Sequence, residues 1–166
     1  MKVEDTFRSA RLFQVLAYGS VISTYILILI GGYVTTTNSG AACGSTPGAD
    51  SWPLCNGGVF PNVGNSAQVI EYTHRVFNLV VGFFVLGTAI IALTRFRRER
   101  GVMLFSAASF VGLLAQVILG MATVTSDLNP VVSDAHLGLA SAVLALLVVN
   151  AVMARNLRPT LLRIQH

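Results

Sequence analysis

Charged residues are scarce in this chain of 166 residues. Asp, Glu, Lys and Arg make up 11% of it, and hydrophobic residues make up 54%. In an ordinary soluble domain about 25% of the residues are charged. The composition therefore disfavours a soluble globular protein and predicts an all-α membrane protein. Since a spanning helix needs roughly 20 residues, the length allows four spans with their loops, or at most five.

Cysteine is also scarce, because Cys43 and Cys55 are the two in the chain. This number excludes a multi-disulfide framework and a four-cysteine zinc site. The net charge of +4 does not indicate a nucleic-acid partner, because the basic residues lie between apolar blocks. A nucleic-acid interface gathers its basic residues on one face.

Four apolar runs predict a four-transmembrane-helix bundle that forms one domain over residues 1–166. The first run, at about 1.5 Å per residue, is long enough to cross the bilayer with some tilt. The segment between the first two helices, residues 35–70, is rich in glycine and is expected to be a long outer loop. The predicted helices cover residues 12–34, 71–94, 101–125 and 134–154.

The basic residues predict the orientation of the helices. The segments 35–70 and 125–133 contain no Lys or Arg, and ten of the 11 basic residues lie in the other connections and termini. The positive-inside rule places the connections and termini that carry the ten basic residues in the cytoplasm. We therefore expect a multi-pass protein of the cell (plasma) membrane with both termini cytoplasmic. Arg75 is the exception, at the outer start of the second helix.

Cys43 and Cys55 both lie in the predicted outer loop. An oxidising compartment favours a disulfide between them, which typically stabilises a fold by about 2–4 kcal/mol. The alternative is a redox-active pair, as in four-helix thiol–quinone oxidoreductases. Those enzymes typically use a Cys-x-x-Cys motif, which this sequence lacks.

Glu71, His74 and Arg75 form the most unusual cluster in the sequence. Their spacing puts them on one face of the predicted second helix. Ionisable side chains at membrane depth cost energy and are functional hypotheses by default. The alternative is an ion pair between Glu71 and Arg75 at the membrane interface, with His74 as a bystander.

His136 begins the predicted fourth helix at a depth similar to that of His74. Two imidazoles that face each other across a helix bundle are a standard way to hold a haem iron. Arg75 would then suit a haem propionate, since Arg matches carboxylate geometry. The alternative is two interfacial histidines that form local hydrogen bonds. Gln116 on the third helix is expected to hydrogen-bond between helices.

A short internal repeat relates the first and third helices. Gly32 to Thr37 and Gly120 to Thr125 close these helices with similar residues, and each is followed by a helix that opens with a histidine. The repeat predicts two helix pairs with one histidine ligand each.

The motifs of the chain resemble those of haem A synthases, over nearly the whole length from the first helix to the fourth. The Glu-x-x-His-Arg sequence at 71–75 and the cysteine-bounded Trp-Pro-Leu-Cys loop are the most specific. The residues that carry the resemblance are Gly31 to Thr35, Ser39, Gly40, Cys43, Trp52 to Gly57, Pro61, Glu71 to Arg75, Gln116 to Gly120, Thr123, Val124, Leu128, Pro130, His136 and Leu137.

The resemblance implies an oxidoreductase that converts the C8 methyl of farnesylated haem O into the formyl of haem A. Successive hydroxylations and loss of water accomplish this, and haem A then serves terminal oxidases. Carried over by position, His74 and His136 are axial ligands of haem iron and Glu71 is a catalytic carboxylate near the reacting methyl. Cys43 and Cys55 are the loop disulfide. The bound haem is a cofactor haem b, the substrate haem O, or both.

Two departures from the family pattern affect this expectation. Family members usually have eight helices in two homologous halves, whereas four are predicted here, so a homodimer is expected. Eleven residues separate Cys43 from Cys55, which is more than the family's short spacing. Haem O, the lipid bilayer and an electron donor of unidentified nature are the expected partners, and haem O synthase or oxidase assembly proteins are candidates.

An alternative function is that of a four-helix bis-histidine cytochrome b that only transfers electrons in the membrane. Such a protein would use His74 and His136 equally well. It has no evident need for Glu71 or for a loop closed by cysteines. A structural membrane protein without catalysis would explain the helices and leave the polar cluster unexplained.

Overall fold

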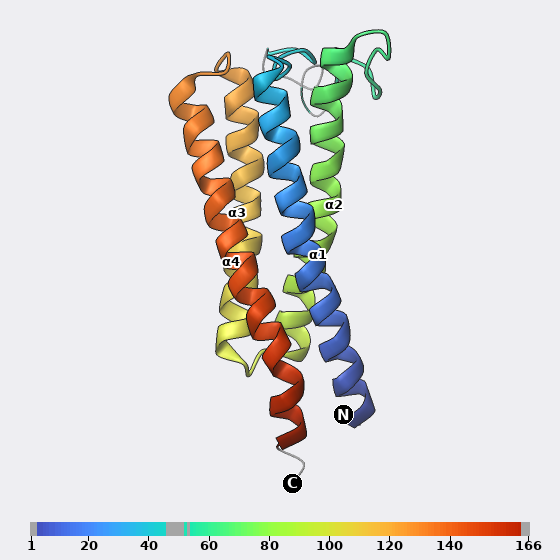
Figure 1. Cartoon of the computed structure of the whole chain (residues 1–166), viewed down its shortest axis with the longest axis vertical. Helices are drawn as coiled ribbons and strands as arrows, with labels where there is room; N and C mark the ends of the chain where they lie inside the picture. Colours follow the sequence, from blue (N-terminus) through green and yellow to red (C-terminus); the bar gives the residue numbers. More distant parts are fainter. Residues whose placement is uncertain (1–2, 46–51, 53, 164–166) are drawn as a thin grey trace. The chain divides into compact units, whose positions relative to one another are not determined.

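The computed structural model of the chain describes residues 3–45, 52 and 54–163. This described part forms four helices and no strand, and each helix is long and apolar enough to cross a membrane. The prediction of an all-α membrane protein with four spanning helices is confirmed. Figure 1 labels the helices, which are α1 (Val3–Thr36), α2 (Ser66–Arg95), α3 (Arg100–Thr125) and α4 (Pro130–Arg163).

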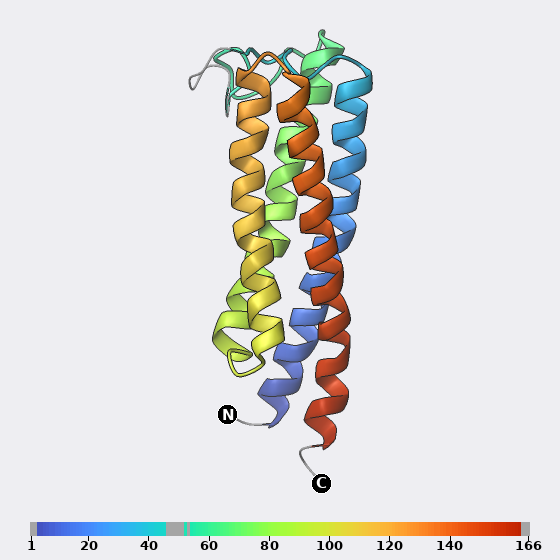
Figure 2. The same cartoon turned by 90° about the vertical axis from the view of Figure 1, so that its left-hand side faces the viewer.

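The contacts within the chain divide it into two compact units, and every helix contributes a segment to each. Unit 1 comprises Met1–Thr24, Val81–Leu113 and Ala142–His166, and unit 2 comprises Tyr25–Val80 and Leu114–Ser141. Within unit 1, the start of α1, the end of α4 and the α2–α3 connection lie at one end (Figure 2). Within unit 2, the α1–α2 loop (residues 37–65) lies at the same end as the α3–α4 connection (Figure 1).

Helices α2 and α4 begin earlier than the apolar runs predict, because asparagine side chains cap them. The Asn65 Oδ1 accepts hydrogen bonds from the backbone N–H groups of Ala67 and Gln68, at 3.1 and 3.3 Å. The Asn129 Oδ1 accepts one from Val131 at 3.0 Å, and Pro130 occupies the first helical position, which suits its fixed backbone angle. The structure thus begins these helices at Ser66 and Pro130, a few residues before the predicted starts at about 71 and 134, because the capping asparagines stand outside the apolar runs.

The predicted ranges were also too short at the start of α1 and at the end of α4. Helix α1 begins at Val3 and α4 continues to Arg163, both beyond the predicted ranges 12–34 and 134–154. An apolar run marks the part of a helix that suits the membrane, and the backbone hydrogen bonds continue past it.

Helices α1 and α3 end in the same backbone motif. The second residue after each helix adopts a left-handed conformation, with φ of 53° at both Asn38 and Asp127. The next N–H then reaches back to a helix carbonyl, from Ser39 to Val34 at 2.9 Å and from Leu128 to Thr123 at 3.0 Å. This is the Schellman cap, which satisfies carbonyls that a helix end leaves without partners.

The caps correct the register of the internal repeat. Gly31 precedes Asn38 by seven residues, and Gly120 precedes Asp127 by the same number. Gly31 is therefore the structural equivalent of Gly120, whereas the sequence pattern had paired Gly32 with Gly120. The earlier pairing was one residue out because it matched residue types, and the caps fix the equivalent backbone positions.

Unit 1 has a continuous apolar core with polar side chains buried beside it. Phe13 and Phe96 pack at 5.5 Å between ring centroids. Asn150 is fully buried and its Nδ2 donates to the Ser106 Oγ at 2.9 Å, which links α3 to α4. The core residues are Ala10, Phe13, Ala17, Ala92, Phe96, Val102, Ala151, Ala154 and Leu157.

We predict that Asn150→Ala lowers the free energy of unfolding of the chain in a bilayer or detergent micelle. Interhelical hydrogen bonds in membranes contribute about 0.6 kcal/mol on average and reach about 1.7 kcal/mol. A double-mutant cycle with Ser106→Ala should give a coupling energy in that range. As a control, Ser141→Ala should change stability by less than about 0.5 kcal/mol, because Ser141 is exposed and bonds only its own helix. Additive effects of the two substitutions would contradict the prediction.

Candidate functional site

The polar cluster of the sequence lies near the start of α2, within unit 2. Glu71 is buried, with 3% of its surface exposed, while His74 and Arg75 are half-buried. A buried carboxylate must be compensated by hydrogen bonds or an opposite charge. The partners of Glu71 therefore decide what this cluster does.

Both oxygens of the Glu71 carboxylate have partners. The Cys43 backbone N–H donates to Oε2 at 2.8 Å, and the Arg75 Nη2 donates to Oε1 in an ion pair one helical turn away. A second guanidinium nitrogen, Nη1 of Arg75, donates to the Leu54 carbonyl at 2.8 Å. Glu71 and Arg75 thus hold the α1–α2 loop at two points, Cys43 and Leu54.

The two points lie at a disulfide bond, since Cys43 is one of its cysteines and Leu54 precedes the other. The structure joins Cys43 to Cys55, with the Cα atoms 4.3 Å apart. The Asn56 N–H donates to the Cys43 carbonyl at 3.0 Å, and Asn56 and Gly57 adopt positive φ angles of 51° and 79° in a tight turn. An Asn-Gly pair favours this turn, because both residues tolerate the left-handed region.

Part of the expected loop motif lies outside the described residues. Trp52 and Leu54 are described and half-buried, whereas Pro53 between them is not. The same holds for Thr46, Pro47 and Gly48, which form most of the insertion between the cysteines. The basic residue Lys2, the acidic residue Asp50 and His166 also lie outside the described part of the chain.

His136 lies in the first turns of α4, also within unit 2, and is half-buried. The Gln116 Nε2 on α3 donates to the His136 backbone carbonyl at 2.9 Å, an interhelical contact of the expected kind. Unit 2 therefore brings together Glu71, His74, Arg75, His136 and the disulfide.

The two imidazoles share an unusual feature. The Nδ1 atom of each ring is buried and has no hydrogen-bond partner among the described residues. A buried polar atom without a partner costs free energy, and such atoms are rare in native structures. The pair fits a haem, whose iron takes two axial histidines while the porphyrin supplies the other ligands. In the described part of the chain no group of three or more His, Cys, Asp or Glu residues could hold a bare metal ion.

Burial within the helices of unit 2 is sparse. Among the described helical residues of this unit, Val34 and Glu71 are the ones that are buried. Its segments of α3 and α4, which carry Gln116 and His136, contain no buried residue. The histidine-bearing part of the chain therefore lacks the tightly packed side-chain core that unit 1 has.

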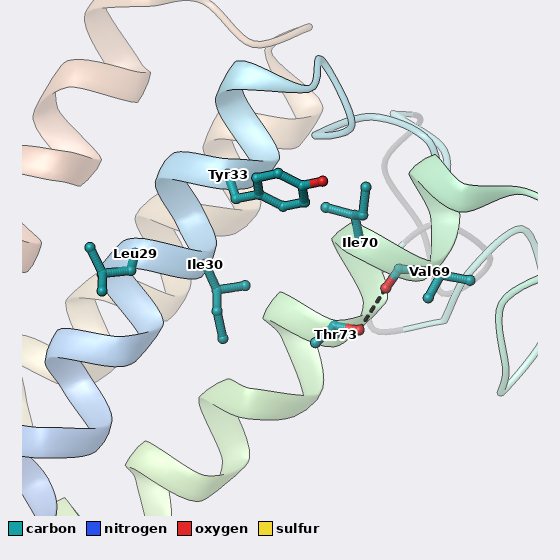
Figure 3. A pocket seen from close by; sticks show the side chains of 6 residues that line it. All are labelled: Leu29, Ile30, Tyr33, Val69, Ile70 and Thr73. Carbon is teal, nitrogen blue, oxygen red and sulfur yellow. Dashed lines mark hydrogen bonds between the residues drawn. The ribbon is translucent and has the colours of Figure 1, made fainter.

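An apolar groove of about 360 Å³ lies between α1 and α2 in unit 2. Figure 3 shows side chains of the two helices around it, and the Thr73 hydroxyl is turned to its own helix, where it donates to the Val69 carbonyl at 2.7 Å. None of the predicted site residues lines this groove. Its lining residues are Leu29, Ile30, Tyr33, Val69, Ile70 and Thr73.

Sequence reasoning missed the contacts that the site makes with main-chain atoms. The spacing of Glu71 and Arg75 indicates an ion pair on one helix face. The backbone groups of Cys43 and Leu54 give no signal in the sequence, because every residue carries them. The glycines that pack against the histidine rings, Gly31 and Gly120, were also missed.

The part of the chain that holds most of these residues matches a known family. Residues 62–166 match the family model described as cytochrome oxidase assembly protein. This matched part contains Glu71, His74, Arg75 and His136 and the whole of α2, α3 and α4.

Several curated relatives named heme A synthase are similar to the chain. The protein of Exiguobacterium sibiricum is 32% identical over 114 residues, 69% of this chain and 37% of that protein. The protein of Alkalihalophilus pseudofirmus is 32% identical over 133 residues, 80% and 43% of the two chains. The protein of Bacillus cereus is 33% identical over 129 residues, which make up 78% of this chain and 40% of that protein. The chain spans about two fifths of the length of these relatives. It belongs to the haem A synthase family, within the cytochrome oxidase assembly proteins.

Proposed function

We propose that this multi-pass membrane protein acts in haem A biosynthesis, as an oxidoreductase that converts the C8 methyl of haem O into the formyl of haem A. The observation that carries the proposal is the clustering in unit 2 of a buried Glu71, its partner Arg75 and the disulfide loop with the two histidines. Relatives named heme A synthase support it. Electron transfer alone would leave the first three features without a use.

His74 and His136 would hold the haem as axial ligands. Their common location in unit 2 and the sparse side-chain core around them support this assignment. A bound haem supplies an iron that gains and loses an electron. The two imidazoles would fix the position of the haem in unit 2.

Glu71 would act on the substrate as a carboxylate of fixed orientation. The Cys43 N–H and the Arg75 guanidinium each hold one of its oxygens, so the group is placed before substrate arrives. Its proposed role is to relay protons or to stabilise positive charge that develops on the oxidised carbon. Propionate binding by Arg75 stays a prediction. The Arg75 guanidinium contacts Glu71 and the Leu54 carbonyl.

The distribution of basic residues supports a site toward the outer face of the membrane. Unit 2 contains one basic residue, Arg75, and the other ten belong to unit 1. By the positive-inside rule, the ends of unit 1 would face the cytoplasm. The homodimer expected from the sequence also stays a prediction.

Expression in cells that make haem O but no haem A tests the proposed activity. We expect the extracted haems to include hydroxylated or formylated haem O when the unsubstituted chain is present. Liquid chromatography with mass spectrometry measures these products. A chain that binds haem normally and yields neither product would contradict the proposal and favour the cytochrome b alternative.

In the same cells, Glu71→Gln should lower product formation by about 10²-fold to 10⁴-fold, the usual contribution of a positioned acid or base. Haem content should persist, because glutamine keeps the size of the side chain. Glu99→Gln is the matched control, since Glu99 is exposed in the α2–α3 connection. Full activity of Glu71→Gln would exclude a catalytic carboxylate at this position.

Removal of either proposed ligand should abolish the spectrum of a six-coordinate low-spin haem. We expect His74→Ala and His136→Ala each to lose this signal in the purified chain, as measured by optical and electron paramagnetic resonance (EPR) spectroscopy. His166→Ala serves as the control, because it replaces the third histidine of the sequence. An unchanged low-spin spectrum in either ligand variant would refute its assignment.

Reduction of the disulfide should release the loop from α2. Cys43→Ser is expected to destabilise the chain by about 2–4 kcal/mol, since it removes the cross-link while the loop must still be ordered. Thermal unfolding measures the loss, and mass spectrometry after alkylation counts the free thiols. Alkylation of both cysteines without prior reduction would show that the pair is not joined in the protein.

A further inference from the structure

Each of the two histidine rings packs against a glycine of the preceding helix. A Cβ atom added at Gly31 on α1 would lie 3.1 Å from Cε1 of His74 and 3.6 Å from its Nδ1. A Cβ atom added at Gly120 on α3 would lie 3.0 Å from Cε1 of His136 and 3.6 Å from its Nε2. In both cases the nitrogen-bearing edge of the imidazole rests on the helix backbone.

The imidazole rings occupy the space beside these two glycines. At both positions the three nearest atoms to the added Cβ are all atoms of the histidine ring. Other glycines in the helices of unit 2 differ, because a Cβ at Gly32 or at Gly138 meets nothing within 4 Å. The contact is therefore a property of two positions and is not shared by glycine in general.

The same contact is built twice at equivalent places. Gly31 and Gly120 each stand seven residues before the left-handed residue of a Schellman cap, and each faces a histidine on the following helix. The neighbours of the two glycines differ, since Tyr33 of α1 corresponds to Ala122 of α3. Glycine recurs at this position although its neighbours differ, which indicates that packing of the imidazole requires a residue without a side chain there.

The imidazoles lack the usual means of orientation. A histidine that binds a metal almost always donates its second ring nitrogen to a carboxylate, carbonyl or water, which fixes the ring. Here the Nδ1 of each ring is buried without a partner among the described residues. The glycine contacts are the close packing that the structure shows against the nitrogen-bearing edge of each ring.

We propose that Gly31 and Gly120 are positioning residues, which set the orientation of the imidazoles of His74 and His136 and thereby their ability to bind haem iron as an axial pair. The inference rests on the proposed function. Ligand geometries of this kind must be held within about 0.5 Å. An added methyl group at 3.0 to 3.1 Å requires the ring to move by a few tenths of an ångström.

The test compares substitutions of the contact glycines with those of their neighbours in the full-length chain. Gly31→Ala and Gly31→Leu are paired with Gly32→Ala and Gly32→Leu, and Gly120→Ala is paired with Gly138→Ala. Each pair gains the same helix propensity, so the difference within a pair reports the contact with the ring. Circular dichroism confirms that each variant remains helical.

The first readouts are the EPR spectrum and the haem affinity of the haem-loaded chain. The alanine variants at Gly31 and Gly120 should shift the EPR g-values of the low-spin haem, and Gly31→Leu should lower haem affinity by about 10-fold to 100-fold, as disturbance of a ligand's support does. The variants of Gly32 and Gly138 should match the unsubstituted chain. Equal effects at Gly31 and Gly32, or none at Gly31, would overturn the proposal.

The second readout needs no haem and separates this inference from the proposed function. In the haem-free chain with ¹⁵N-labelled histidine, Gly31→Ala should shift the imidazole resonances of His74 and leave those of His136 unchanged, while Gly120→Ala does the reverse. Unshifted resonances would overturn the positioning role even if haem binds. If the two variants shift as expected but the unsubstituted chain binds no low-spin haem, the ligand assignment of the proposed function alone would be overturned.

Discussion

The organisation of unit 2 depends on the contacts that the buried carboxylate of Glu71 makes. A charge removed from solvent is tolerated only when its oxygens are satisfied, and here Cys43 and Arg75 each satisfy one. Because one partner is a backbone group of the loop, the loop cannot leave α2 without depriving one carboxylate oxygen of its hydrogen bond. The disulfide and the Leu54 carbonyl complete the closure, so that a loop rich in glycine acquires a defined position.

The helix pairs α1–α2 and α3–α4 repeat a backbone plan more closely than they repeat a sequence. Both end their first helix in a Schellman cap, begin their second helix with an asparagine cap, and set a histidine against a glycine. The two pairs differ in what is added. Only the first carries the carboxylate, the guanidinium and the disulfide loop among the described residues, so any chemistry beyond ligation is expected on the side of α2.

The sequence predicted much of the fold because membrane helices leave a strong signal in apolarity and in the placement of Arg and Lys. It placed the starts of α2 and α4 too late, since the capping asparagines Asn65 and Asn129 stand outside the apolar runs. Helical spacing indicated the pairing of Glu71 with Arg75. The contacts of Cys43 and Leu54 could not be predicted, because they use backbone atoms whose approach depends on the path of the whole loop.

The contrast between the two units bears on how the histidines are held. In unit 1, helices are fixed by a continuous apolar core and by hydrogen bonds such as that between Asn150 and Ser106. In unit 2, the described parts of α3 and α4 bury no side chain, and neither imidazole Nδ1 has a described partner. In the proposed arrangement, ring orientation comes from close contact with the helix backbone, which a residue without a side chain allows. A glycine at these positions therefore takes over the role that a hydrogen-bond acceptor has in most histidine-bound metal centres.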